Sequence, residues 1–465
     1  MLTQIIQHFA QQTPVAMMVE GLLERALPAD DLQKIFNDHA LVQYERKVLF
    51  SDIVELMSVV VCRIRPSISS AIKNWHEKLP AERKAIYEKI NHTEPQLGQQ
   101  LVQHSARKLA PLVDSLNARQ EPLVPGYRTR ILDGNHHAAT DHRLQILRDT
   151  TAGALPGFSL VVYEPEIDLV THQFPCEDGH ESERNRHDKI FNIVEPGDLW
   201  IADRHFCTTR FLSGLITRQA AFVIRDHATN APWEEVTPWQ PSGRCSTGEV
   251  YEQTVRLLLA DGSYQETRHI KVVLDQPIRN GDRELYLLSN LPATVAAVTI
   301  AEIYRLRWTI ETSFQAIEAN LRSEIATLNQ PKAALFVFAV ACVAFNIYRL
   351  VKSVIRAEHG TATAAELSGY DVANEVAGMQ RSVQIVIPLD YWQELAGYSP
   401  VQFALWLREL ARQIPLARFR KFKQYPKKPK KKPAHDPHEP HLSTYRKLKE
   451  QKEQKEQKEQ KQEKG

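Results

Sequence analysis

Two aspartates that follow apolar runs are the first residues of this sequence with clear chemical potential. Asp133 comes after Ile131 and Leu132, and Asp203 follows the apolar run 199–202. A strand that ends in such an acid would place the carboxylate at the carboxyl end of a sheet, where active sites tend to gather. Each aspartate alone is best explained as a turn residue or a helix cap. Two of them together with a third carboxylate justify a joint hypothesis, because a buried carboxylate needs a compensating cation or donor.

The third carboxylate belongs to the segment 304–322, which we expect to form one helix. At about 100° per residue, five polar side chains of this segment share one narrow stripe: Tyr304, Arg307, Glu311, Glu318 and Arg322. Trp308 lies beside the stripe, and an apolar face next to it could pack on a sheet. The pattern leaves two interpretations open. The stripe could complete a site with the aspartates, or Arg307 and Glu311 could form an exposed ion pair worth about 0.2–0.5 kcal/mol.

The composition is that of a globular protein with room for two or three domains. Of the 465 residues, 43% are hydrophobic and 25% are charged, which are ordinary values. The formal net charge is +2, but residues 418–465 carry a net charge of +10 and the remainder carries −8. The body of the protein is therefore not generally basic, and any contact with phosphate must come from local patches or from the tail.

Several kinds of site and location are disfavoured by what the sequence lacks. The five cysteines include no CxxC pair, which argues against a disulfide framework or a zinc site and favours the reducing cytoplasm. GxSxG, P-loop and HExxH motifs are absent. The N-terminus lacks a signal-peptide pattern. The longest apolar run, 333–345, is shorter than the roughly 20 residues of a spanning helix, so we expect a buried core helix and no membrane.

The order of elements predicts an α/β fold with a mixed sheet. Helical spacing without strand patterns precedes residue 118, and short β-rich runs bounded by Pro, Gly or Asp begin after residue 123. Asp261–Gly262 and Asn280–Gly281 predict turns within a β-rich insertion. We expect six segments: a helical N-terminal domain (1–118), the first part of the α/β core (119–225), the β-rich insertion (226–296), the second part of the core with the Glu helix (297–350), a helical C-terminal region (351–417) and a tail (418–465).

The tail and one internal loop are rich in charge. Residues 418–432 contain nine Lys or Arg and no acid, and we favour contact with DNA phosphates for this block. The EQK repeat that follows is of low complexity, which predicts disorder or at most a solvated helix. The loop 176–188 contains Cys176, His180 and His187, but their spacing is not that of a zinc site. We expect this loop to be solvated surface.

The order of these features resembles that of the DDE transposases of bacterial insertion sequences. Asp-Gly after a strand, ADRHF after a strand, a β-rich insertion and Tyr-x2-Arg-x3-Glu on a helix follow one another over residues 120–350. The separations are 70 residues between the two aspartates and 108 between Asp203 and Glu311. The chain resembles the branch of that family with a Tyr-Arg-Glu-Lys signature and an RNase H-like core.

This resemblance implies a site, a cofactor and partners. Asp133, Asp203 and Glu311 would be the metal-binding triad for two Mg²⁺ or Mn²⁺ ions, and Tyr304 and Arg307 would contact the DNA backbone. The protein would bind the terminal repeats of its element, cleave there and join the 3′-ends to target DNA. It would act at the nucleoid in the cytoplasm, as a homodimer or larger assembly, with the N-terminal helices as the candidate for end recognition.

One position departs from the signature of this branch. Glu318 stands where the family has Lys, and Arg322, one turn further along the expected stripe, could supply the missing positive charge. Trp308 is a further candidate DNA contact. Trp233 and Trp239 in the insertion are candidates for stacking on a flipped base, although core packing is the favoured role for both. Two alternatives stay open: an RNase H-like nuclease without strand transfer, and a catalytically inactive DNA-binding relic, which the glutamate would suit.

Overall fold

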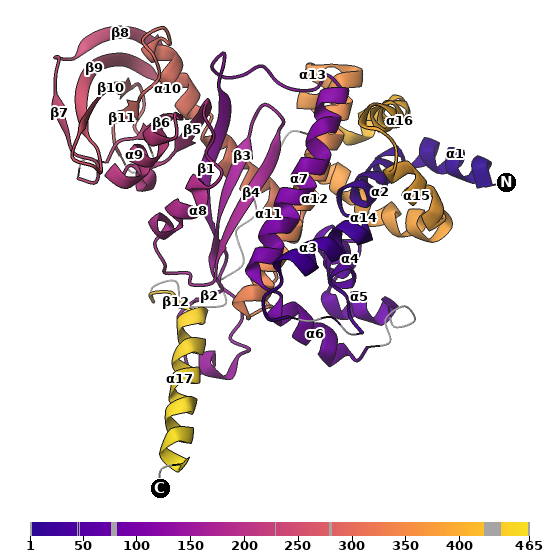
Figure 1. Cartoon of the computed structure of the whole chain (residues 1–465). Coiled ribbons are helices and arrows are strands. Elements are labelled where there is room, and N and C mark those ends of the chain that lie inside the picture. The colour runs from indigo at the N-terminus through magenta and orange to yellow at the C-terminus, as the bar shows by residue number, and fades with distance from the viewer. Residues whose placement is uncertain are drawn as a thin grey trace.

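The computed structural model describes residues 2–463 apart from 44, 46, 76–80, 228, 279–280 and 423–438. A large sheet and a body of packed helices lie side by side, and the C-terminal helix projects away from both (Figure 1). The turn predicted at Asn280 and most of the basic block 418–432 fall outside the described residues.

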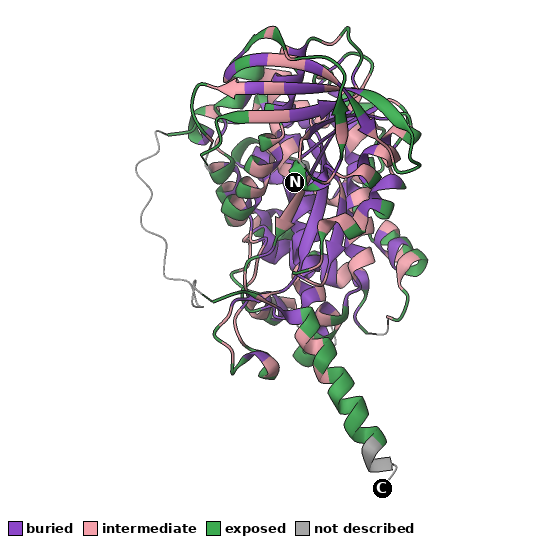
Figure 2. Cartoon of the chain, turned by 90° about the vertical axis from the view of Figure 1, so that its left-hand side faces the viewer, coloured by how far each residue is buried: buried purple, intermediate pink, exposed green. Residues whose placement is uncertain are grey.

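Five strands form the core of the sheet in the order β4-β3-β1-β5-β6. Their bounds are β1 (Arg128–His136), β3 (Phe158–Glu164), β4 (Leu169–Cys176), β5 (Asp198–Ala202) and β6 (Ala221–Arg225). β1 pairs antiparallel with β3 and parallel with β5, and β5 pairs parallel with β6. The interior strands β3 and β5 are buried along their length (Figure 2), as expected where helices cover both faces. The predicted α/β fold with a mixed sheet is confirmed.

The β-rich insertion extends this same sheet instead of forming a sheet of its own. β11 (Glu284–Ser289) pairs antiparallel with β6, and β10 (Tyr264–Leu274) and β9 (Gly248–Leu258) follow. The predicted hairpin turn at Asp261–Gly262 joins β9 and β10. β7 (Trp233–Glu235) and β8 (Gln240–Cys245) both pair with β9. These strands curl around α10 (Ala297–Arg305), which packs on β8 and β9 (Figure 1).

Helices from both ends of the chain form one packed body. The N-terminal helices are α1 (Leu2–Gln12), α2 (Pro14–Ala26), α3 (Ala29–His39), α4 (Phe50–Val61), α5 (Ile68–Trp75), α6 (Arg83–His92) and α7 (Pro95–Ser115). The C-terminal helices are α12 (Pro331–His359), α13 (Thr361–Ala365), α14 (Gly369–Val386), α15 (Leu389–Ala396) and α16 (Pro400–Arg412). α14 and α15 pack on α2, and α16 packs on α7. The two helical regions that we expected separately bury their apolar faces against each other.

Smaller elements cover the other face of the core sheet. α8 (His187–Phe191) and α9 (Thr209–Thr217) belong to an apolar cluster with residues of β3 and β5. Short 3-10 turns are η1 (Gln145–Leu147), η2 (Glu183–Arg186), η3 (Arg204–Phe206) and η4 (Leu416–Phe419). The opposite face packs on α7 and α12. The core sheet therefore lies between two helical layers.

α12 is the core helix that the apolar run predicted. By length and composition alone it could cross a membrane, and 83% of its most apolar stretch is buried inside the fold. Asn346 accepts the N–H of Val170 at 2.8 Å and donates to its carbonyl at 2.7 Å. These two bonds satisfy backbone groups of the edge strand β4 that would otherwise be buried without partners.

The C-terminal segment is helical, where the sequence favoured disorder. β12 (Leu442–Ser443) pairs with β2 (Ala154–Leu155), and Arg446 binds Asp178 at 2.7 Å. These contacts fix the start of α17 (Thr444–Glu463) to the core. The repeat places Lys and Glu one helical turn apart, as in the pair Lys452–Glu456. The exposed remainder of α17 (Figure 2) is the solvated helix that the sequence left as the alternative.

Candidate active site

Asp133 and Asp203 leave neighbouring strands at the same level. The parallel pairing of β1 with β5 ends at Leu132 and Ala202, so each aspartate is the next residue along its chain. Asp133 nevertheless lies inside β1, which continues to His136 against β3, and not after the strand as we expected. Asp203 caps η3 and accepts the N–H of His205 at 2.9 Å. The antiparallel partner of β1 therefore extends the sheet beyond the point where the acids emerge.

The expected Glu helix is divided into two helices. α10 ends at Arg305, and α11 (Trp308–Asn320) begins three residues later. Around the break, the N–H groups of Leu306 and Arg307 bind carbonyls three residues back, which tightens the backbone into a 3-10 turn. The prediction of one continuous helix over 304–322 is therefore wrong.

Arg307 joins two of the predicted carboxylates in spite of this break. Its Nη1 lies 2.8 Å from Asp133 Oδ2, and its Nη2 lies 2.5 Å from Glu311 Oε1. The guanidinium carbon is 6.0 Å from the ring centroid of Tyr304. Arg307 and Asp133 have side chains that are only 11% and 15% exposed. The structure thus brings these four residues into one shielded cluster, beside which Asp203 lies at the end of β5.

Burial and mutual repulsion perturb the acids of this cluster. Burial, with the charges of Asp203 and Glu311, raises the pKa of Asp133 to about 6 against the opposing effect of Arg307. The Tyr304 hydroxyl is buried, which raises its pKa to about 12. One arginine therefore does not fully compensate the carboxylates around it.

Glu183 is a fourth carboxylate, which the sequence analysis missed. It begins η2, and a Cβ built on Gly134 would lie 1.9 Å from its Oε1, so its carboxylate rests against the backbone beside Asp133. Burial and the charges of Asp203 and Asp133 raise the pKa of Glu183 to about 7. The only sequence signal was the charged loop 176–188.

That loop is folded against the core, which corrects the expectation of solvated surface. Arg186 binds Glu181 at 2.6 Å, and His187 is buried against the ring of Phe211 at 4.8 Å between centroids. Packing of this kind depends on distant residues and has no periodic signal in the sequence.

The donor chemistry of the cluster suits a hard divalent cation, but its arrangement is closed. Carboxylate oxygens are the ligands that Mg²⁺ and Mn²⁺ prefer, and burial together with neighbouring carboxylates raises the pKa of Asp133 and of Glu183. Among the described residues, however, no three His, Cys, Asp or Glu side chains are grouped so that they could hold one ion. Instead, one oxygen of Asp133 and one oxygen of Glu311 are bonded to the guanidinium of Arg307.

Arg322 does not continue the stripe, because α11 ends before it. Its backbone N–H donates to the carbonyl of Val61 at 2.8 Å, and its guanidinium donates to the carbonyls of Arg65, at 3.3 Å, and Pro66. In return, Arg63 donates to the carbonyl of Ala319 at 2.9 Å. The arginine that we expected to contact DNA thus fastens α11 to the end of α4.

The aromatic candidates differ in exposure. Trp308 is 48% exposed at the start of α11. Trp233 donates from its indole to Asp226 at 3.3 Å and packs on His269, and Trp239 lies under the ammonium group of Lys271, 4.7 Å from the ring centroid. The contacts of both insertion tryptophans are those of a packed cluster.

Comparison with known families identifies the central part of the chain. Residues 126–347 match the family model of the transposase DDE domain. The match supports a DDE transposase. It extends from just before β1 into α12 and contains Asp133, Asp203 and Glu311. A comparison with curated proteins finds no match.

Glu318 remains the departure of the matched segment from the signature of the expected branch. It lies on the exposed side of α11, and its backbone carbonyl accepts from Arg63 at 3.5 Å. A cation from the helical body therefore reaches the end of α11 where the signature lysine would stand. Arg63 and Glu318 are 255 residues apart, so no local pattern could have indicated this contact.

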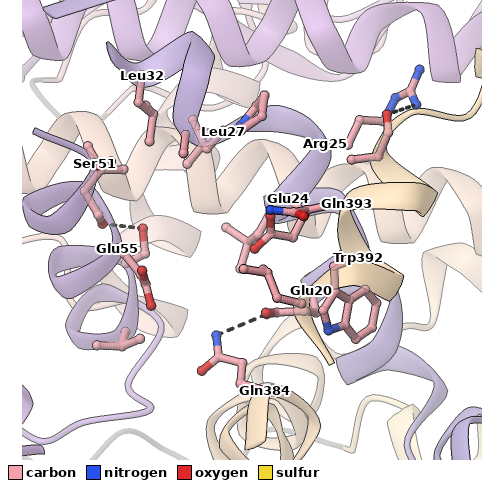
Figure 3. Close-up of a pocket in the computed structure, with 18 of the residues that line it drawn as sticks. Glu20, Glu24, Arg25, Leu27, Leu32, Ser51, Glu55, Gln384, Trp392 and Gln393 are labelled. Carbon is pink, nitrogen blue, oxygen red and sulfur yellow. Dashed lines mark hydrogen bonds between the residues drawn. The ribbon is translucent and has the colours of Figure 1, made fainter. Parts of the chain in front are cut away.

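A cavity of about 960 Å³ lies outside the DDE domain, in the helical body (Figure 3). Glu20 points into it from α2 and accepts side-chain N–H groups of Gln384, at 3.2 Å, and Gln380. Burial, with the nearby charge of Glu24, raises the pKa of Glu20 to about 8. The residues that line the cavity include none of the predicted site residues, and we assign it no part in the chemistry.

Proposed function

We propose that this protein is a DNA transposase that binds the ends of its element, cleaves phosphodiester bonds there and transfers the 3′-ends to target DNA. The observation that supports the proposal is that Asp133 and Asp203 emerge at the same level of neighbouring strands, and that Arg307 joins Asp133 to Glu311, inside the segment that matches the transposase DDE domain. The spacing Tyr-x2-Arg-x3-Glu supports the Tyr-Arg-Glu-Lys branch, and the strand order β4-β3-β1-β5-β6 supports an RNase H-like core.

Asp133, Asp203 and Glu311 would hold two Mg²⁺ or Mn²⁺ ions. When bound, such ions supply activation of a water or 3′-hydroxyl and stabilisation of the leaving oxygen. The protein itself would position the DNA. Arg307 offers a planar pair of donors to a phosphate, and the exposed indole of Trp308 lies next to it in the chain.

The parts of the chain outside the DDE domain would bring DNA ends together. We propose that the N-terminal helices recognise the terminal repeats, and that the basic block 418–432 adds contacts to phosphates that do not depend on sequence. Two ends must meet in one synaptic complex, so we propose a homodimer there, at the nucleoid in the cytoplasm.

One observation favours a second candidate, an inactive DNA-binding relic. Glu318 places a negative charge where the signature of the branch has a positive one, on the exposed side of α11. A relic would still bind the element ends but would not cut them. A nuclease without strand transfer would cut them and produce no joined product.

A cleavage and joining assay separates these functions. The substrate is a plasmid that carries the DNA flanking the gene, with Mg²⁺ or Mn²⁺, and the variants are Asp203→Asn and Glu311→Gln. We expect cut and joined products with the wild type and none with either variant. Glu302→Gln is the matched control, because this acid of α10 pairs with Arg305 at 2.6 Å, on the exposed surface. Products that persist in both triad variants would contradict the site, and binding without cleavage by the wild type would favour the relic.

A further inference from the structure

We infer that Arg307 closes the metal site in the DNA-free protein, and that a phosphate of the DNA opens it by drawing this guanidinium away from the carboxylates. The inference rests on the proposed function and adds a step before it. Arg307 would act first as an internal cation and then as a ligand of the DNA backbone.

Arg307 holds two acids of the triad at the same time. Each terminal nitrogen of its guanidinium binds a different carboxylate, Asp133 at 2.8 Å and Glu311 at 2.5 Å. The arginine side chain is 11% exposed. Because water screens a shielded contact less than it screens a surface pair, the contact with Asp133, whose side chain is 15% exposed, is stronger than an ordinary i,i+4 pair.

This pairing competes with the binding of a divalent cation. The ion would need the same carboxylate oxygens, and a guanidinium between them would oppose it with a like charge. Within the described ranges, no three acidic, His or Cys side chains are grouped to hold an ion. The closed arrangement of the triad is therefore explained by the arginine that bridges it.

The carboxylates around Arg307 favour its replacement by divalent cations. Arg307 binds Asp133 and Glu311, the carboxylate of Glu183 rests against the backbone beside Asp133, and Asp203 emerges from the neighbouring strand. A phosphate that bound Arg307 would leave these acids without their bonded cation. Divalent ions would then meet both the charge and the oxygen chemistry of the cluster.

Arg307 uses only part of its donor capacity in the closed position. Its Nε has no hydrogen-bond acceptor in the part of the chain that the structure describes. The residue lies at the break between α10 and α11, so its side chain can turn without disrupting a continuous helix. Glu311 is 44% exposed and can rotate towards solvent. The planar guanidinium also fits two phosphate oxygens as well as it fits carboxylates.

Manganese binding to the DNA-free protein tests the inference without measuring activity. Free Mn²⁺ is followed by electron paramagnetic resonance in titrations of the full chain, for the wild type, Arg307→Gln and the control Arg305→Gln. Arg305 is two residues away and binds Glu302 instead of the triad. We expect Arg307→Gln to bind Mn²⁺ at least tenfold more tightly than the wild type, and the control to match the wild type. Adding Asp133→Asn to Arg307→Gln should abolish the gain.

A second arm adds a duplex from the DNA that flanks the gene, with the signal of the duplex alone subtracted. The duplex should tighten Mn²⁺ binding by the wild type and leave Arg307→Gln unchanged. Equally tight binding by the wild type and Arg307→Gln without DNA would overturn the inference and leave the transposase proposal standing. No Mn²⁺ binding by any variant, with or without DNA, would overturn both. Should thermal melting show that Arg307→Gln is unfolded, Arg307→Met, which also removes the charge, replaces it, and a failure of that variant to tighten binding would overturn the inference.

Discussion

At the residue scale, the buried Asp133 of the candidate site differs from the buried Asp168 in how its negative charge is compensated. Asp168 is buried and forms an ion pair at 2.5 Å with Arg349, which it shares with no acid of the candidate site. Asp133 shares Arg307 with Glu311, and burial beside these charges raises its pKa to about 6. A buried ion pair with matched charges has a structural role, whereas an excess of carboxylates is typical of sites that bind cations.

The buried Glu20 leads to a prediction of how the stability of the folded protein depends on pH. Its pKa is about 8 in the folded protein against an ordinary value of 4.5. Between these values the folded state holds one more proton than the unfolded state, so the contribution of Glu20 to stability is lost as the pH rises. Glu20→Gln removes this titration and keeps an oxygen that can accept from Gln380. We expect the stability of the variant relative to the wild type to increase from pH 5 to pH 8, by up to about 1.4 kcal/mol per pH unit.

Urea unfolding of both proteins at several pH values measures this difference. Asp30→Asn is the control, because this acid of α3 is exposed and is not among the charges that raise the pKa of Glu20. A constant difference between Glu20→Gln and the wild type across the pH range would contradict the assignment of a buried, protonated Glu20.

At the scale of secondary-structure elements, the ends of the helices determine where the site residues lie. The 3-10 turn between α10 and α11 keeps Tyr304, Arg307 and Glu311 together. The other end of α11 is held by Arg63, whose guanidinium donates to its last carbonyls, and by the N–H of Arg322. A cation at a helix C-terminus also interacts favourably with the helix dipole. The helical body therefore positions the helix that carries Glu311.

Arg63→Ala should loosen the C-terminal end of α11. Both side chains carry a Cβ at the positive φ of 62°, so the backbone strain is unchanged and the lost bonds determine the effect. Amide exchange over 315–321 should become faster, equivalent to about 1–3 kcal/mol of lost protection. Arg65→Ala is the control, since its backbone carbonyl still accepts from Arg322. Equal exchange in the two variants would show that Arg63 does not hold this end.

The whole molecule joins three regions that the chain order separates. The insertion prolongs the core sheet through β11, and helices from both termini form one body behind it. The tail returns to the core at β12 before α17 projects outward (Figure 1). DNA that reached the candidate site could therefore also meet basic residues from the tail.

Replacing the five lysines at 427–432 by glutamine should weaken DNA binding in a salt-dependent way. Each phosphate contact that is lost should reduce the slope of log K against log salt by about 0.9. The matched control replaces the five lysines at 449–461, which changes the net charge equally but lies among glutamates of the repeat. Fluorescence anisotropy with a duplex of arbitrary sequence measures both slopes. Equal slopes for the two variants would contradict a specific role of the basic block.

Local patterns predicted the elements well where burial follows periodicity. The alternating runs and the Asp-Gly turn predicted the hairpin β9–β10, and the apolar run at 333–345 predicted a core helix. For the tail the sequence favoured disorder and left the helix as the alternative, because the start of this helix depends on Arg446 binding Asp178, which is 268 residues away. The Glu helix was predicted as one element because its break has helical torsion angles and differs only in its hydrogen bonds.

The sequence by itself determined the mixed α/β class and proposed Asp133, Asp203 and Glu311 as one site, because apolar runs and helical spacing are properties of neighbouring residues. The tertiary structure alone decided that Arg307 bridges two of these acids and that Glu183 joins them. It also decided that Arg322 faces the helical body. The contact of Arg307 with Asp133 spans 174 positions and that of Arg322 with Pro66 spans 256. Hydrogen bonding and charge act over distances in space, which no spacing along the chain records.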